Sequence, residues 1–237
     1  MTSEEIKRNY NIVKERVINT ALSCGRNPDE ITIVAVSKTH PYDIIIDAMS
    51  AEVNVFGENY VQEMKEKVEL LDSKNITQPE WHYIGHLQTN KVKYIVPFVS
   101  LIHSVDSVHL AEEISKQSKK HNRTIDILLQ VNTSGEESKS GCEPVETCDI
   151  FRAIKDIENI NVKGLMTIGS FSDNEFIYRN EFRLLKSMLE QMNEKYPEVN
   201  VKHLSMGMTH DFEAAIEEGA TIIRVGTAIF GERTYSQ

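Results

Sequence analysis

The sequence predicts a single (β/α)8 (TIM) barrel preceded by one extra N-terminal helix. Short runs rich in β-branched residues alternate with longer segments of helical periodicity, and eight such β-then-α units follow one another. The length of 237 residues suits one barrel. Strict alternation implies parallel strands joined by right-handed crossovers, and eight units close a barrel. An open doubly wound sheet is the alternative.

The leading helix is expected within residues 1–25, because apolar side chains recur at helical spacing up to Gly25. The barrel follows over 31–231, and the whole chain, 1–237, is expected to be one domain. The expected strands are Ile31–Ser37, Val53–Phe56, Trp81–Ile84, Leu101–Val105, Ile125–Val131, Val162–Ile168, Val201–Leu204 and Thr221–Val225. The expected helices are Ile44–Met49, Tyr60–Leu71, Lys91–Val96, Leu110–Lys120, Val145–Ile157, Glu175–Glu194, Phe212–Glu217 and a short one near Thr227.

Composition excludes several classes of function. The 26 basic and 36 acidic residues give a net charge of −10, which disfavours binding to nucleic acid or to anionic membranes. The N-terminus lacks an apolar signal core, so a cytoplasmic protein is expected. The three cysteines show no CxxC spacing and the histidines no HExxH spacing. We therefore expect neither disulfides nor a metal.

Lys38 follows the first expected strand. Period-two alternation puts it on the same face as Val34 and Val36, so it points into the barrel mouth if those residues fill the barrel. Partial desolvation there lowers the pKa of an amine and favours the neutral form that makes Schiff bases. The alternative is a lysine that extends from the strand end into water.

The seventh and eighth strands lead into glycine turns. The Ser205 hydroxyl and the backbone N–H groups of Gly226 and Thr227 would make a phosphate cup, where barrels commonly hold phosphate. Arg224 alternates with Ile222, so inside the barrel its guanidinium would meet a ring nitrogen or carboxylate of a ligand. An ion pair with Glu58, or with another acidic residue at a strand end, is the structural alternative.

Several motifs together resemble one family, the pyridoxal 5′-phosphate homeostasis proteins, also called the YggS or PROSC family. The motifs are AVSKT at 35–39, FGENYVQE at 56–63, WHYIGHLQ at 81–88, GLMTI at 164–168, LSMGM at 204–208 and RVGTAIFG at 224–231. The resemblance implies a fold-type-III barrel like the N-terminal domain of alanine racemase, with Lys38 forming the internal aldimine to pyridoxal phosphate (PLP).

The resemblance also implies the remaining cofactor contacts. Ser205, Gly226 and Thr227 would hold the phosphate and Arg224 would face the pyridine nitrogen, while the other cofactor-binding residues expected in these motifs are Asn59 and Met208. Lys139, in the loop after the fifth strand, is the expected second, transient site. The chain departs from the family pattern at 169–174 and 209–210, which concerns contacts at the rim.

The family implies a non-catalytic protein that stores or delivers PLP and contributes to vitamin B6 and amino-acid homeostasis. The expected partners are PLP and, as recipients, apo forms of PLP-dependent enzymes, and a monomer is expected. Few residues follow the last motif before Gln237, so we expect neither the second domain nor the partner tyrosine of a racemase. The alternatives are a low-activity amino-acid racemase and a barrel enzyme that binds a sugar phosphate without PLP.

Overall fold

Eight parallel strands close into a barrel in the computed structural model, which describes residues 1–136, 138–170, 172–199 and 201–232. Each strand pairs with the next along the chain, and the last pairs with the first. The strands are β1 (Thr32–Val36), β2 (Val55–Glu58), β3 (Glu80–Tyr83), β4 (Leu101–Val105), β5 (Ile125–Gln130), β6 (Ile160–Met166), β7 (His203–Ser205) and β8 (Ile222–Val225). The barrel prediction is confirmed, and the open sheet is excluded.

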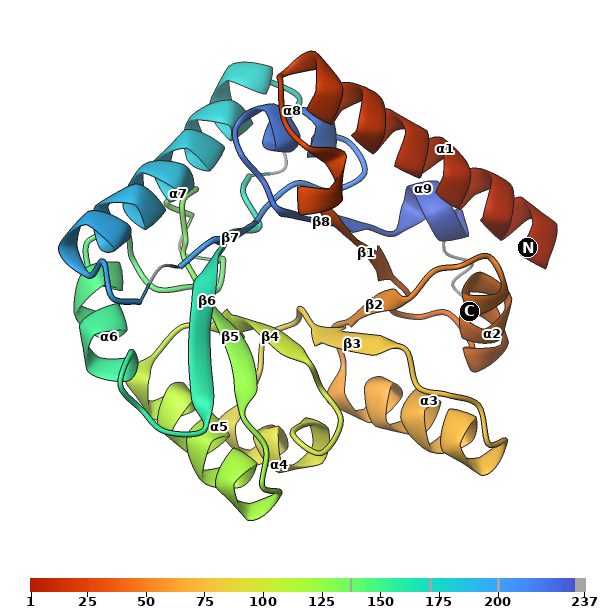
Figure 1. The fold of residues 1–237 in the computed structure, drawn as a ribbon, viewed down its shortest axis with the longest axis horizontal. Helices are drawn as coiled ribbons and strands as arrows, with labels where there is room; N and C mark the ends of the chain where they lie inside the picture. Colours follow the sequence, from red (N-terminus) through yellow and green to blue (C-terminus); the bar gives the residue numbers. More distant parts are fainter. Residues whose placement is uncertain (137, 171, 200, 233–237) are drawn as a thin grey trace.

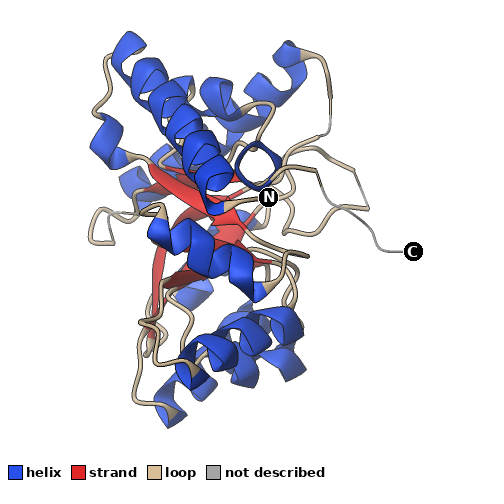
Figure 2. Ribbon diagram, turned by 90° about the vertical axis from the view of Figure 1, so that its right-hand side faces the viewer, coloured by secondary structure: helices blue, strands red, loops and turns tan. Residues whose placement is uncertain are grey.

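Helices surround this barrel, as Figures 1 and 2 show. They are α1 (Ser3–Ser23), α2 (Tyr42–Ser50), α3 (Val61–Ser73), α4 (Val92–Ile95), α5 (Val108–Lys120), α6 (Thr147–Ile154), α7 (Glu175–Lys195), α8 (Phe212–Glu217) and α9 (Thr227–Phe230). The sequence did not predict two short 3-10 helices, η1 (Pro28–Glu30) and η2 (Thr89–Lys91). Among the described residues, no helix combines the length and apolar character needed to cross a membrane.

The leading helix α1 packs on the outside of the barrel, against α8 and α9 (Figure 1). Its first turn is closed by a capping box, in which the Glu5 N–H donates to the Thr2 hydroxyl and the Glu5 carboxylate accepts from the Thr2 N–H. Beyond its C-terminal end, the Arg26 guanidinium donates to the carbonyls of Ile216 and Ala220 at 2.6 and 2.8 Å. These bonds fix the leading helix to the end of α8.

Two apolar clusters build the core. The larger one packs the outer faces of the strands against the helices and includes Trp81, Phe151 and Phe182. The smaller one comes from inward-facing residues of the strands and contains Val34, Leu101, Leu128, Met166 and Ile222. Because Val34 belongs to it, the predicted orientation of β1 is confirmed.

The seventh strand starts later than the sequence predicts. Val201 was expected inside the strand, but the side chain of Asn193 binds both of its backbone groups. The Val201 N–H donates to Asn193 Oδ1 at 2.9 Å, and Asn193 Nδ2 donates to the Val201 carbonyl at 2.8 Å. A residue whose backbone groups are already bonded in this way is not available to the sheet ladder.

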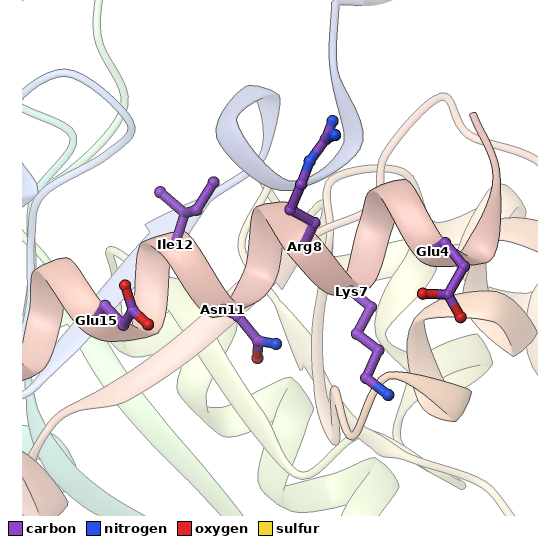
Figure 3. Close-up of a pocket in the computed structure, with 6 residues that line it drawn as sticks. All are labelled: Glu4, Lys7, Arg8, Asn11, Ile12 and Glu15. Carbon is purple, nitrogen blue, oxygen red and sulfur yellow. The ribbon is translucent and has the colours of Figure 1, made fainter.

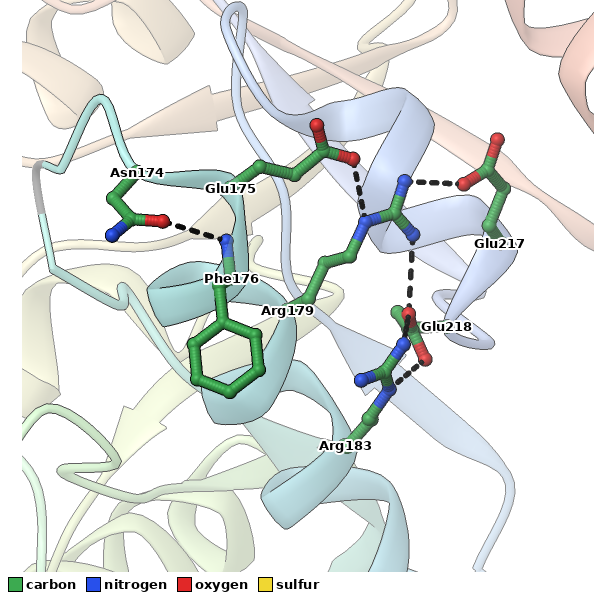
Figure 4. Close-up of polar contacts among 7 residues, drawn as sticks. All are labelled: Asn174, Glu175, Phe176, Arg179, Arg183, Glu217 and Glu218. Atoms are coloured by element: carbon green, nitrogen blue, oxygen red, sulfur yellow. Dashed lines mark hydrogen bonds and ion pairs between the residues drawn. The ribbon is translucent and has the colours of Figure 1, made fainter.

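Helices α7 and α8 are joined by an ion-pair cluster, drawn in Figure 4. The Arg179 guanidinium contacts Glu175, Glu217 and Glu218 at 2.7, 2.6 and 3.1 Å. Arg183 adds a second contact to Glu218 at 2.7 Å. The three carboxylates raise the pKa of Arg179, so the guanidinium stays charged and its ion pairs hold α7 against α8.

Candidate functional site

The turn that carries Lys38 lies at the carboxyl end of β1, where barrels place their ligands. Lys38 is half-buried, and its carbonyl accepts from the Thr39 hydroxyl at 2.6 Å. Thr39 has a left-handed backbone with φ of 66°, which is unfavourable for a β-branched residue, and its N–H donates to Glu63 Oε1 at 2.6 Å. The backbone around Lys38 is thus held in a defined shape.

A buried ion-pair cluster lies behind this turn. Lys67 Nζ contacts Glu58 Oε1 at 2.6 Å, Glu63 Oε1 at 2.7 Å and the Ser37 carbonyl at 2.8 Å. The Ser37 hydroxyl donates to Glu58 Oε1 at 2.6 Å. Burial raises the pKa of Glu58 to about 7, against the opposing effect of Lys67. Sequence reasoning missed Lys67, because its spacing to Glu63 is that of an ordinary surface ion pair on a helix.

Asn59 directly follows β2 at the same end of the barrel. Its backbone carbonyl accepts from the Tyr83 hydroxyl at 2.9 Å. Gly85 is required beside it, because a Cβ at Gly85 would lie 2.2 Å from the Asn59 carbonyl oxygen. The side-chain atom Asn59 Oδ1 is buried and has no hydrogen-bond partner within the described part of the chain. Such an atom at a barrel mouth is suited to a ligand.

The turn after β7 is shaped by Gly207. Its φ of 92° and a distance of 2.5 Å from an added Cβ to the Ala215 Cβ both require glycine. The Gly207 carbonyl accepts from the Arg224 N–H at 3.0 Å, which ties the turn to β8. Met208 follows half-buried, with its N–H donating to Asp211 Oδ1 at 2.5 Å.

Gly226 and Thr227 begin α9 beside β1. A Cβ added to Gly226 would lie 3.3 Å from the Val36 carbonyl oxygen, so these residues lie at the same end of the barrel as the Lys38 turn. The Thr227 side chain is exposed. The N–H groups of Thr227 and Ala228 belong to the first helical turn and have no acceptor in the described ranges. They are available to an anion.

Arg224 lies inside the barrel, as its alternation with Ile222 predicts. Its guanidinium is buried and donates to Ser205 Oγ at 2.7 Å and to the Thr167 carbonyl at 2.8 Å. Burial lowers its pKa to about 10, so it stays charged at neutral pH. The alternative ion pair with Glu58 is wrong, because Glu58 is bound by Lys67.

Ser205, which the sequence predicts in the phosphate cup, makes its side-chain hydrogen bonds inside the barrel. Its side chain is fully buried, accepts from Arg224 and bonds to His103 Nδ1 at 2.9 Å. The other ring nitrogen of His103 is hydrogen-bonded to His82, and His82 is hydrogen-bonded to the Glu80 carboxylate. The sequence did not single out His103, which stands in the otherwise apolar strand β4. The structure therefore brings Lys38, Asn59, Met208, Gly226 and Thr227 to the mouth, and it turns the Ser205 side chain inward.

Two surface depressions lie among the described residues. One depression lies on the outer face of α1, away from the strand ends, and is lined by Glu4, Lys7, Arg8, Asn11, Ile12 and Glu15 (Figure 3). The second adjoins the mouth, between the segments that follow β3 and β4. Lys139 Nζ donates to the Gly169 carbonyl at 2.5 Å and pairs with Glu136 at 2.9 Å. No group of metal-ligating side chains is found among the described residues.

Known proteins are similar to this chain in sequence and, where a structure has been solved, in fold. Residues 2–234 match the family described as alanine racemase, N-terminal domain. A pyridoxal phosphate homeostasis protein of Aquifex aeolicus (strain VF5) is 44% identical over 223 residues, covering 94% of this chain and 96% of its own. A structure of an unknown protein from Bifidobacterium adolescentis is 37% identical, with a TM-score of 0.90 and coverage of 96% and 95%. PipY of Synechococcus elongatus PCC7942, with PLP bound, is 32% identical, with a TM-score of 0.81 and coverage of 92% and 100%.

Proposed function

Because this chain belongs to the family of pyridoxal phosphate homeostasis proteins, within the alanine racemase N-terminal domain group, we propose that it binds PLP at the mouth of its barrel and stores or delivers it. The observation that carries the proposal is Arg224. This buried cation has no carboxylate partner in the described ranges, and its two bonds leave further N–H donors for a ligand acceptor.

The groups at the mouth fit the parts of PLP. We infer that the Lys38 amine is the covalent attachment point for the aldehyde carbon, and that the N–H groups at the start of α9 and the Thr227 hydroxyl hold the phosphate. Asn59 Oδ1, buried without a partner, offers an acceptor for a hydroxyl group. We propose that Ser205 holds Arg224 in place and does not bind the phosphate, because its hydroxyl is already hydrogen-bonded to Arg224 and to His103.

Arg224 also supports a carrier function. PLP supplies an electrophilic aldehyde, and it is a strong electron sink only when its pyridine nitrogen is protonated. A permanent positive charge opposite that nitrogen disfavours its protonation. The residues at the mouth therefore favour retention of the cofactor over efficient carbanion chemistry. The match to the alanine racemase N-terminal domain favours the second candidate, a low-activity amino-acid racemase.

Borohydride labelling tests the binding site. The purified protein is expected to absorb visible light, and reduction followed by peptide mapping is expected to place the pyridoxyl group on Lys38. Lys38→Ala should lose the label, while Lys139→Ala, changed in a neighbouring loop, should keep it. A label found mainly on another lysine in the wild type contradicts the assignment.

A second assay separates a carrier from an enzyme. The holo-protein is mixed with an apo PLP-dependent enzyme, whose activity should return, and separately with L- or D-amino acids in deuterated solvent. The carrier proposal predicts no appreciable α-proton exchange or racemisation. Rapid stereospecific exchange that disappears in Lys38→Ala would establish the racemase alternative.

A further inference from the structure

A chain of hydrogen bonds crosses the inside of the barrel. Glu80 Oε1 bonds to His82 Nε2 at 3.0 Å, and His82 Nδ1 to His103 Nε2 at 3.0 Å. His103 Nδ1 bonds to Ser205 Oγ at 2.9 Å, and Ser205 Oγ to the Arg224 guanidinium at 2.7 Å. These hydrogen bonds thus connect β3 and β4 with β7 and β8 across the interior.

The groups at the two ends of this series of hydrogen bonds determine which atom donates in each bond. A guanidinium can only donate, so Ser205 Oγ accepts from Arg224; a carboxylate can only accept, so His82 Nε2 donates to Glu80. With both imidazoles neutral, each ring then has one donor and one acceptor. His103 must donate from Nε2 to His82 and accept at Nδ1, which leaves the Ser205 hydroxyl as the donor to His103. Every bond is satisfied in this one arrangement.

Burial favours the neutral ring that this arrangement needs. His103 is fully buried, and its pKa lies well below 6.5 because of desolvation, with further repulsion from His82 and Arg224. Glu80, at the opposite end of β3 from the mouth, has a side chain that is 53% exposed. The series of hydrogen bonds therefore begins at solvent, at the end of the barrel opposite the mouth, and ends at Arg224, which is buried beneath the mouth.

We propose that His103, and through it His82, are positioning residues for Arg224. His103 accepts the Ser205 proton and so holds Ser205 Oγ as the acceptor that fixes one guanidinium nitrogen; the Thr167 carbonyl fixes the other. The inference rests on the proposed function, in which Arg224 faces the pyridine nitrogen. Without His103 the guanidinium keeps one anchor, and its direction toward the mouth is no longer fixed.

The test uses PLP labelled with 15N at the pyridine nitrogen and bound to three variants. An asparagine places an amide oxygen near the position of His103 Nδ1, so His103→Asn can still accept from Ser205. A glutamine reaches the position of Nε2, so His103→Gln keeps the contact with His82 and loses the one with Ser205. His103→Leu removes both contacts and keeps an apolar side chain of similar size.

The expected result is a split between the two amide variants. The wild type and His103→Asn should give the 15N shift of an unprotonated nitrogen that accepts a hydrogen bond. His103→Gln and His103→Leu should move it toward the shift of a nitrogen without that bond and weaken PLP binding by about tenfold. The proposal is overturned if Asn and Gln give the same shift at unchanged melting temperature. A wild type with no bound 15N signal would overturn the proposed function, and this inference with it.

A measurement on the wild type alone keeps the proposal testable if the variants do not fold. Long-range 1H–15N correlation spectra report which ring nitrogen of each histidine carries the proton. Both His82 and His103 are expected with the proton on Nε2. A proton on His103 Nδ1 would show that Ser205 is not its donor, and it would overturn the proposal.

Discussion

The buried carboxylate of Glu58 makes the stability of the barrel depend on pH. Its pKa is raised to about 7 from an ordinary value of 4.5, mainly by burial. Between these values the folded chain holds a proton that the unfolded chain releases, so the free energy of unfolding falls as pH rises. One pKa unit corresponds to about 1.36 kcal/mol, which gives about 3 kcal/mol in total. Most of this change falls between pH 5 and 8.

Glu58→Gln removes the titrating group while keeping an oxygen that accepts from Ser37 and Lys67. The wild type should therefore lose about 2–3 kcal/mol relative to the variant when the pH is raised from about 5 to 8. Urea unfolding at several pH values, without added PLP, measures this difference. Glu69→Gln is the control, because Glu69 is 60% exposed and pairs with Lys65 on the surface; its profile should run parallel to that of the wild type.

A constant difference between wild type and Glu58→Gln across this pH range would refute the reasoning. It would mean that the ion pair with Lys67 keeps Glu58 charged throughout, and that attraction at 2.6 Å outweighs the cost of burial. The same result would leave the geometry of the Lys38 turn unaffected, since the pair would still hold the Ser37 carbonyl.

Three further changes have expected outcomes. Thr227→Ala should raise the PLP dissociation constant about tenfold in equilibrium dialysis, through a lost hydrogen bond to a charged phosphate, and should leave the melting temperature of the cofactor-free protein unchanged. Gly207→Ala should cost about 2–4 kcal/mol in urea unfolding because its Cβ would meet Ala215, whereas Gly135→Ala, with open space around it, should cost about 1 kcal/mol. Arg179→Ala should lower the free energy of unfolding by about 1 kcal/mol, and by less at high salt, because two of its three carboxylate partners, Glu175 and Glu217, have side chains that are 60% and 39% exposed.

The sequence by itself was sufficient to predict the fold and to identify which residues lie at the carboxyl ends of the strands. Alternation of β-rich and helical segments predicted eight parallel strands, and period-two patterning put Val34 and Arg224 inside the barrel, where they are neighbours in the β1–β8 register. Local periodicity is sufficient for such predictions because it depends only on backbone geometry and on which face is buried. The part that Lys38 takes in binding stays a prediction.

Only the tertiary structure decided which polar groups meet. Ser205 and His103 are 102 residues apart in the chain and bond across the barrel, and Lys67 reaches Glu58 from a helix that packs outside the strands. Strand pattern assigns a side chain to the interior, but its partner there depends on barrel closure and on the register of strands that are distant in sequence. That is why Ser205 was expected at the phosphate and lies instead between His103 and Arg224.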